Sequence, residues 1–376
     1  MLLGGMALIS CDPEPDPEPT PSSNRIVLTN IKTNTTWYSD TVYQLGGRIS
    51  VEDGATLTIQ PGTIIKGEAG TGANATALLI ARGAKLIAEG TPSLPIIFTS
   101  VADEISPSDI LTGNFGSPNL DPTVNGLWGG LIVLGNANIS ASNTTGDVSS
   151  VQIEGIPTSD PNGLYGGVNN TDNSGVIKYV SIRHGGANIG SGNEINGLTL
   201  GGVGSATIIE NIEVVANQDD GIEFFGGTVN VKNVVSWNVG DDAIDTDQSW
   251  AGTLDNFVII NPANHMFELD GPEGTYPAGH IIKNGDVYVG GGADLINVDD
   301  NSIVDLINIY FTDIQAANKI NRVTAPQVTF TNIVLDVDSV HLHVNGTVPS
   351  GVTSGQTPKA NTSVFSWTWA KQSNMF

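Results

Sequence analysis

Short apolar runs recur along the chain at a spacing of about two dozen residues. The segment D-D-G-I-E at 219–223 returns as D-D-A-I-D at 241–245, with an offset of 22 residues. Inside the second copy, Ile244 alternates with the acidic residues Asp245 and Asp247, which is the pattern of a strand that buries one face. A repeat of this length made of short strands predicts a solenoid in which each copy forms one coil.

The same apolar–polar pair can be followed beyond these two copies. The pairs that align with Ile222-Glu223 are 195–196, 244–245, 267–268 and 296–297, and the steps between successive pairs are 27, 22, 23 and 29 residues. The steps vary in length although the strands keep the same alternating pattern. This indicates that the strands stack as equal coils, while the loops between them differ in length. The sequence therefore predicts an all-β, single-domain, right-handed parallel β-helix rather than a propeller or a helical array.

A column of asparagines supports this register. Five apolar runs each open with an asparagine, at Asn211, Asn233, Asn256, Asn284 and Asn332. The run around Leu306 has no asparagine at the matching place. Because asparagine tolerates the left-handed backbone conformation and hydrogen-bonds neighbouring main chain, we expect these residues to stack as a ladder at one corner of the coil.

Regular coils are expected over residues 25–345. The 46 glycines and the low aromatic content of 6% suit many tight turns. The polar segments that are expected to project from the coil as loops are 103–125, 138–150 and 157–174. The tail 346–376 loses the register, and its alternating Phe365, Trp367 and Trp369 predict a cap over the open end of the solenoid.

The first 24 residues predict an anchor and a tether. Residues 1–11 end in L-I-S-C, which resembles a bacterial lipobox with Cys11 as the lipidated residue. The usual basic residues before such a signal are missing, which favours a start further upstream or a trimmed chain. Residues 12–24 form a Pro/acid tether, similar to the surface-export signal of Bacteroidetes lipoproteins. We therefore expect an extracytoplasmic protein, held at the outer membrane or cell surface by its lipid alone and without disulfides, since Cys11 is the only cysteine.

Several motifs resemble a known group of proteins. They include G-A-T-L-T-I-Q-P-G-T-I-I-K-G, P-I-I-F-T-S, G-L-W-G-G-L-I-V-L-G-N-A, I-E-G-I-P, E-I-N-G-L-T-L-G-G-V-G and D-D-G-I-E-F-F-G-G, over about residues 35–260. In combination they resemble the right-handed parallel β-helix lipoproteins and secreted proteins of Bacteroidetes and marine bacteria, which have the pectate-lyase-like superfold. The resemblance implies the fold and an extracytoplasmic location, but no reaction.

Acidic residues dominate the candidate chemistry. The net charge of −25 argues against nucleic acid as a partner, because phosphates would be repelled. With coils about 4.8 Å apart, two outward columns of carboxylates are expected, namely Glu223, Asp245 and Glu268, and beside them Asp247, Asp270 and Asp299. Such neighbours repel unless solvent screens them, a cation binds, or a raised pKa keeps one protonated. Ca²⁺, which prefers carboxylate and carbonyl oxygens, is the expected cation.

Acid catalysis is a second reading of the same face. G-D-D-A-I-D resembles the paired-aspartate segment of polygalacturonases, which implies Asp241, Asp242 and either Asp219 or Asp220 as the acid/base set. The His-Gly and Arg-x-Lys motifs of that family have no convincing counterpart, since His184-Gly185 lies upstream of the acids. A Ca²⁺-dependent lyase would need a base from the scarce Arg183 or Lys232. The residues expected to contact a substrate are Arg183, His184 and Trp250, with Trp128 and Tyr165 as further aromatics for sugar stacking.

Three readings therefore stay open. In the first, the acids only make turns and a solvated face. In the second, the protein is a non-catalytic surface module that binds glycans, matrix or a partner protein, with or without Ca²⁺. In the third, it degrades polysaccharides through the region from Asp219 to Asp247. A basic side chain facing the acids would favour the enzyme, and an acid face without one would favour the binding module.

Overall fold

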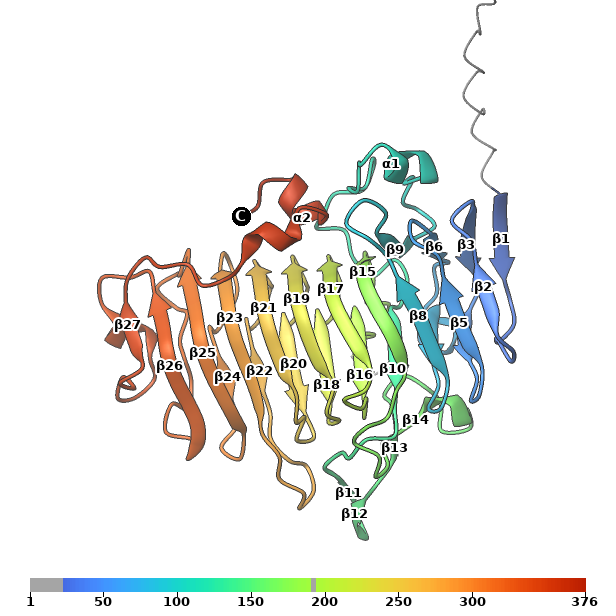
Figure 1. Cartoon of the computed structure of the whole chain (residues 1–376). Coiled ribbons are helices and arrows are strands. Elements are labelled where there is room, and N and C mark those ends of the chain that lie inside the picture. Colours follow the sequence, from blue (N-terminus) through green and yellow to red (C-terminus); the bar gives the residue numbers. More distant parts are fainter. Residues whose placement is uncertain (1–22, 191–193) are drawn as a thin grey trace, which may run out of the picture.

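The strands stack into a single long coil. The structure, a computed structural model, describes residues 23–190 and 194–376, and Figure 1 shows the strands as successive rungs. Pairing within the two main sheets is parallel throughout. This arrangement confirms the predicted all-β parallel β-helix.

Two main parallel sheets together form the coil. The long sheet has the neighbour order β1 (Ser23–Val27), β3 (Thr41–Leu45), β6 (Ile64–Gly67), β9 (Ile96–Ser100), β15 (Gly175–Arg183), β17 (Ile208–Val215), β19 (Asn230–Trp237), β21 (Thr253–Ile260), β23 (His280–Tyr288), β25 (Ile303–Thr312), β26 (Gln327–Leu335) and β27 (Val352–Ser354). Its early part also contains β2 (Thr35–Trp37), β5 (Thr56–Ile59) and β8 (Lys85–Glu89). The short sheet has the order β24 (Asn297–Val298), β22 (Glu268–Leu269), β20 (Ile244–Asp247), β18 (Ile222–Phe225), β16 (Leu198–Gly201), β10 (Leu131–Leu134), β7 (Ala77–Ile80) and β4 (Arg48–Val51).

The interior of the coil is a continuous apolar core. In the short sheet, Leu131, Leu198, Ile222 and Ile244 lie in register on successive strands, and each is fully buried. Complete burial of such a side chain contributes roughly 1.5 to 3 kcal/mol. Each coil therefore stabilises its neighbours through the inward face of a strand, and the outward face is left for polar residues.

The asparagine ladder lies where the strands of the long sheet bend. Its members have positive φ, and Asn233 donates to the Asn211 amide oxygen at 3.0 Å, as Asn256 does to Asn233 at 2.8 Å. The expectation that the coil around Leu306 lacks an asparagine is wrong, because Asn308 has φ 55° and donates to Asn284 at 3.1 Å. Asn308 lies 24 residues after Asn284 and 24 residues before Asn332, so the ladder continues through this coil.

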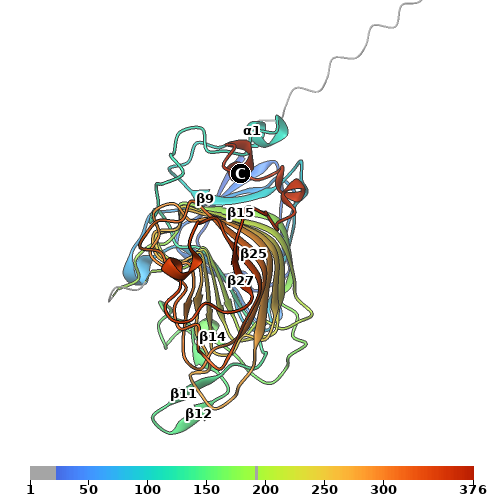
Figure 2. The ribbon, with the colours of Figure 1, turned by 90° about the vertical axis from the view of Figure 1, so that its left-hand side faces the viewer.

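Long connections cover part of the outer face of the short sheet. Two hairpins, β11 (Ala141–Asn143) with β12 (Gly146–Val148) and β13 (Val151–Gln152) with β14 (Leu164–Tyr165), belong to one such connection. It buries a second apolar cluster against the sheet, with Ile132, Ile139, Ile153 and Tyr165 among its members. Figure 2 shows the coil end-on, with the β11–β12 hairpin projecting on the side opposite to helix α1 (Pro107–Leu111).

Helices are few and short. Besides α1, they are η1 (Gly72–Asn74), η2 (Pro161–Gly163), η3 (Val340–His343), η4 (Thr362–Phe365) and α2 (Trp369–Gln372). Within residues 23–190 and 194–376, none has the length and apolar character needed to cross a membrane.

The C-terminal segment does not cap the coil in the predicted way. Residues 356–376 turn back along the long sheet, and α2 contacts the segment that follows α1 through Gln372 (Figure 1). There, Trp369 packs edge-on against Trp237, with ring centroids 5.6 Å apart. The prediction was wrong because the apolar outer face of β17, β19 and β21 needs a cover. At the end of the coil, Val340 and Val348 pack against the core instead.

Candidate carboxylate site

The structure places the predicted acids in register. Glu223 pairs with Asp245, Asp245 with Glu268, and Glu268 with Asn297 on successive strands. The alignment is wrong one coil earlier, where Thr199 rather than Asn196 lies beside Glu223. Asn196 instead precedes β16, and its side-chain amide still donates to the Glu223 carboxylate.

These acids are not a solvated face. Glu223 is 6% exposed and Asp245 is 9% exposed. Connections from both sides shield this part of the sheet, since Tyr165 and Glu273 both hydrogen-bond to Gln248, one residue after Asp247. The turn-and-solvent reading therefore fails for Glu223 and Asp245, whose carboxylates are buried, while Glu268 in the same column is half-buried.

The aspartates at the strand entrances bridge successive coils. Asp220 Oδ1 accepts the backbone N–H of Asp242 at 2.9 Å, and Asp242 Oδ1 accepts that of His265 at 2.6 Å. Asp241 Oδ1 accepts from the Asn264 side chain at 2.7 Å. Asp220 and Asp242 thus have a structural role, in cross-coil bonds rather than in the local turns that the sequence suggested.

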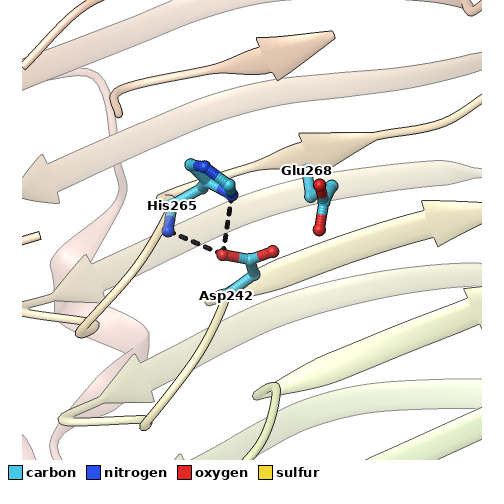
Figure 3. A group of neighbouring side chains, drawn as sticks. All are labelled: Asp242, His265 and Glu268. Carbon is cyan, nitrogen blue, oxygen red and sulfur yellow. Dashed lines mark hydrogen bonds and ion pairs between the residues drawn. The ribbon is translucent and has the colours of Figure 1, made fainter. Parts of the chain in front are cut away.

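His265 joins the site from the next coil. Its Nδ1 atom is 3.0 Å from Asp242 Oδ1, and Glu268 lies beside the pair in Figure 3. Burial lowers the pKa of His265, but contact with Asp242 and the nearby carboxylates raises it overall. Sequence reasoning missed this histidine, although it follows Asp242 by 23 residues and so matches the repeat.

Three clusters of ligand atoms result, each with its atoms within 4.8 Å of one another. They are Asp219 with Asp220 and Asp241, Asp220 with Glu223 and Asp245, and Asp242 with His265 and Glu268. The four predicted catalytic aspartates and three of the six predicted metal ligands, Glu223, Asp245 and Glu268, therefore belong to these clusters. Among the described residues, no such cluster includes Asp247 or Asp270. Asp299 is apart from them, since it is about half-exposed and pairs with Arg322.

Burial and mutual repulsion favour the protonated forms of these acids. Burial first, and neighbouring carboxylates second, raise the pKa of Asp219 and of Asp247 to about 7 and that of Asp270 to about 6. Burial and the adjacent Asp242 raise the pKa of Glu268 to about 9. The same causes hold the pKa of Glu223 and of Asp245 well above the ordinary range.

Two buried oxygens of residues that contact or pair with Glu223 find no hydrogen-bond partner among the described residues. They are Asp245 Oδ1 and Asn196 Oδ1, the latter from a residue that is 1% exposed. A buried acceptor without a partner costs about 1 to 3 kcal/mol. Among the described residues, no lysine or arginine forms an ion pair with Glu223, Asp245 or Glu268. The cluster therefore has unused ligand atoms and no built-in cationic side chain besides His265.

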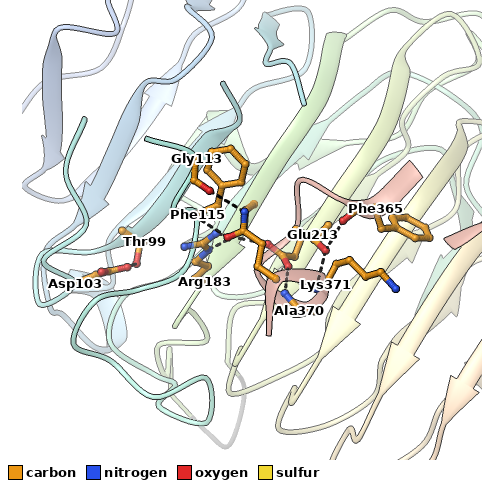
Figure 4. A network of polar contacts seen from close by, with 12 residues as sticks. Thr99, Asp103, Gly113, Phe115, Arg183, Glu213, Phe365, Ala370 and Lys371 are labelled. Atoms are coloured by element: carbon orange, nitrogen blue, oxygen red, sulfur yellow. Dashed lines mark hydrogen bonds and ion pairs between the residues drawn. The ribbon is translucent and has the colours of Figure 1, made fainter. Parts of the chain in front are cut away.

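The predicted substrate-contacting residues lie elsewhere. Trp250 is in the core, stacked on Phe224 with centroids 3.9 Å apart, so it cannot stack on a sugar. Trp128 and Tyr165 are also buried. Arg183 and His184 lie under the C-terminal segment, where Arg183 pairs with Glu213 at 3.6 Å (Figure 4). Lys232 is on the outer face of the long sheet, so neither candidate lyase base faces the acids.

Stacked parallel sheets with polar columns on their outer faces define a parallel β-helix protein. The chain belongs to the pectate-lyase-like β-helix domain family, whose family model matches residues 29–372. No curated protein and no solved structure matches the chain. The β-helix part of the resemblance is thus confirmed, and membership of a Bacteroidetes lipoprotein group stays a prediction.

Proposed function

We propose that this protein is a cell-surface, lipid-anchored glycan-binding module whose carboxylate site holds Ca²⁺. The observation that carries the proposal is the unpartnered, buried Asp245 Oδ1 within a cluster of carboxylates that has no lysine or arginine partner. The family is consistent with a polysaccharide-related or surface-binding role. A bound divalent cation would relieve the repulsion that raises the pKa of the clustered acids.

The ligand set suits a hard cation. Asp220, Glu223 and Asp245 would supply carboxylate oxygens, and Asn196 would add an amide oxygen. Ca²⁺ takes six to eight such oxygens in flexible geometry. When bound, it would neutralise the clustered carboxylates and hold successive coils together, and the half-buried Asp241 and Glu268 at the edge of the site would be left to contact a glycan.

Calorimetric Ca²⁺ titration of residues 23–376 tests the cation. We expect binding heat with the natural sequence and none with Asp245→Asn, which removes a charge but keeps the shape. Ca²⁺ at about one hundred times Kd should raise the free energy of unfolding by about 2.7 kcal/mol. Asp338→Asn, which removes an exposed carboxylate outside the site, is the matched control and should bind normally. Absence of heat and of thermal stabilisation in the natural sequence would contradict the proposal.

Hydrolysis of a polysaccharide is the second candidate. It is favoured by a specific observation, the contact of Asp242 with His265 beside Glu268, whose pKa of about 9 keeps it protonated at neutral pH. Glycoside hydrolysis needs one protonated carboxyl group and one ionised carboxylate. Release of reducing ends from a panel of acidic and neutral polysaccharides, abolished by Glu268→Gln and kept by Asp338→Asn, would support this activity over simple binding.

A further inference from the structure

The outer face of the long sheet carries a column of alternating charges. Lys178 pairs in register with Glu210, Glu210 with Lys232, Lys232 with Asp255, and Asp255 with Lys283. The three lysines therefore occupy alternate coils, about 9.6 Å apart at twice the coil spacing. The chain has only 14 basic residues, so this concentration stands out from the net charge of −25.

Only the central lysine of the column is unpaired. Lys178 Nζ lies 3.5 Å from Glu210, and Lys283 Nζ lies 3.7 Å from Asp255. Among the described residues, Lys232 forms no ion pair, because its two acidic neighbours are held by the outer lysines. Its exposed ammonium group is thus available to an anion from outside.

Lys232 lines two adjoining grooves of about 410 and 310 Å³. The first also contains Lys283, and the second is bounded by Lys359 of the C-terminal segment. The side chains of Asn230 and Thr253 lie on adjacent coils of the first groove and make no hydrogen bond to the described part of the chain. The first groove therefore offers free amide and hydroxyl groups beside the unpaired ammonium group of Lys232, and its two carboxylates, Glu210 and Asp255, are paired with the outer lysines.

We propose that this groove binds an extended anionic glycan, with its carboxylate or sulfate group on Lys232. A peptide fits less well, because strands β17 to β23 are paired on both sides and offer no free edge for strand addition. The linings also contain no aromatic side chain to anchor an apolar residue. Polar groups repeated on successive coils suit a polymer that lies along the coil axis.

Titration with matched oligosaccharides tests the proposal. Residues 23–376 are titrated in chelator with a galacturonate hexasaccharide, a sulfated hexasaccharide and a neutral hexasaccharide. We expect salt-sensitive binding of at least one anionic sugar and none of the neutral one. The carboxylate and sulfate arms identify which anionic group is recognised. Lys232→Ala should weaken this binding about tenfold, as the loss of one charged hydrogen bond would.

Lys85→Ala is the matched control, since Lys85 is an exposed lysine of the same sheet outside the grooves. It should leave the affinity unchanged. Chelator removes Ca²⁺, so glycan binding in this groove is measured apart from the proposed Ca²⁺ site. Lys232→Ala should leave Ca²⁺ binding unchanged, and the groove should bind the anionic sugar even if the acid site binds no Ca²⁺. Equal affinity of Lys232→Ala and the natural sequence, binding of the neutral sugar, or binding of an acidic peptide in place of both anionic sugars would overturn the proposal.

Discussion

Asp245 illustrates how stacking changes the chemistry of a single residue. It lies between Glu223 and Glu268, and it is 9% exposed. An isolated aspartate on a strand would ionise freely, but here each added charge meets another about one coil away. The residue therefore prefers a proton or a cation, and both alternatives can be distinguished by pH.

Stability of the metal-free protein should fall as pH rises from about 4 to 7, between the unfolded and folded pKa of Asp247. The pKa of Asp247 is raised to about 7 in the fold and is about 3.9 when unfolded. Between these values the folded state holds more protons than the unfolded state, so its free energy of unfolding decreases with pH. Asp247→Asn should flatten the slope, with a gain on the order of 1 to 3 kcal/mol at pH 8. Urea denaturation in chelator measures this. The Asp338→Asn control should keep the natural slope, and stability that rises over this range would contradict the expectation.

Asn256 shows how the left-handed backbone and the hydrogen bonds of the asparagine ladder constrain a single residue. It has φ 65°, donates to Asn233 and accepts the backbone N–H of Asn361 at 2.7 Å. Asn256→Ala should lower the free energy of unfolding by about 2 to 4 kcal/mol, through strain and lost hydrogen bonds. Asn256→Gly relieves the strain alone and should cost less. Equal losses of unfolding free energy in the two variants would show that the left-handed backbone of Asn256 causes no strain in the alanine variant.

The sequence predicts which residues stack but not how deeply they are buried. The 22-residue offset between Glu223 and Asp245 is a property of the strands, which repeat regularly. Their burial depends on Tyr165 and Glu273, whose connections follow no period. His265 matches the repeat, 23 residues after Asp242, but the repeat does not reveal that its ring contacts the Asp242 carboxylate.

At the level of elements, the C-terminal segment acts as a strap along the coil. Its Ala370 N–H donates to Glu213 Oε1 at 2.9 Å (Figure 4). Arg183 lies 5.1 Å from the Trp369 ring centroid. Asp286 accepts the backbone N–H of Lys359 at 2.6 Å. The alternating aromatic residues correctly predicted that the C-terminal segment packs against the coil. The segment packs along the side of the coil rather than at its end. Because this contact joins segments that are far apart in the chain, no local sequence pattern predicts it.

Glu213→Ala should lower the free energy of unfolding by about 3 to 5 kcal/mol, because it leaves Arg183 buried without its counter-charge. Replacing both residues, as Arg183→Met with Glu213→Leu, should restore most of the loss. Denaturation curves measure the stability, and limited proteolysis of residues 356–376 reports release of the strap. A loss below about 1 kcal/mol for Glu213→Ala would mean that water reaches Arg183 in the folded protein.

At the level of the whole molecule, the coil separates two kinds of surface. The short sheet carries the buried carboxylates, and the long sheet carries the lysine groove. A rigid solenoid keeps these surfaces at fixed positions, since each coil contacts its neighbours on both sides. Such a molecule suits attachment to a surface, where one end is held and the sides meet polymers.

Cys11→Ser tests that attachment. Cys11 lies outside the described residues, and its lipidation is a prediction from the L-I-S-C motif. In a bacterium that processes lipoproteins, the natural sequence should fractionate with membranes and be reachable by protease on intact cells. The serine variant cannot form the thioether to the lipid, so it should lose the anchor and move to the soluble fraction. Ser10→Ala keeps both the cysteine and a small neighbour and should stay membrane-bound. Membrane association that survives Cys11→Ser would place the anchor elsewhere.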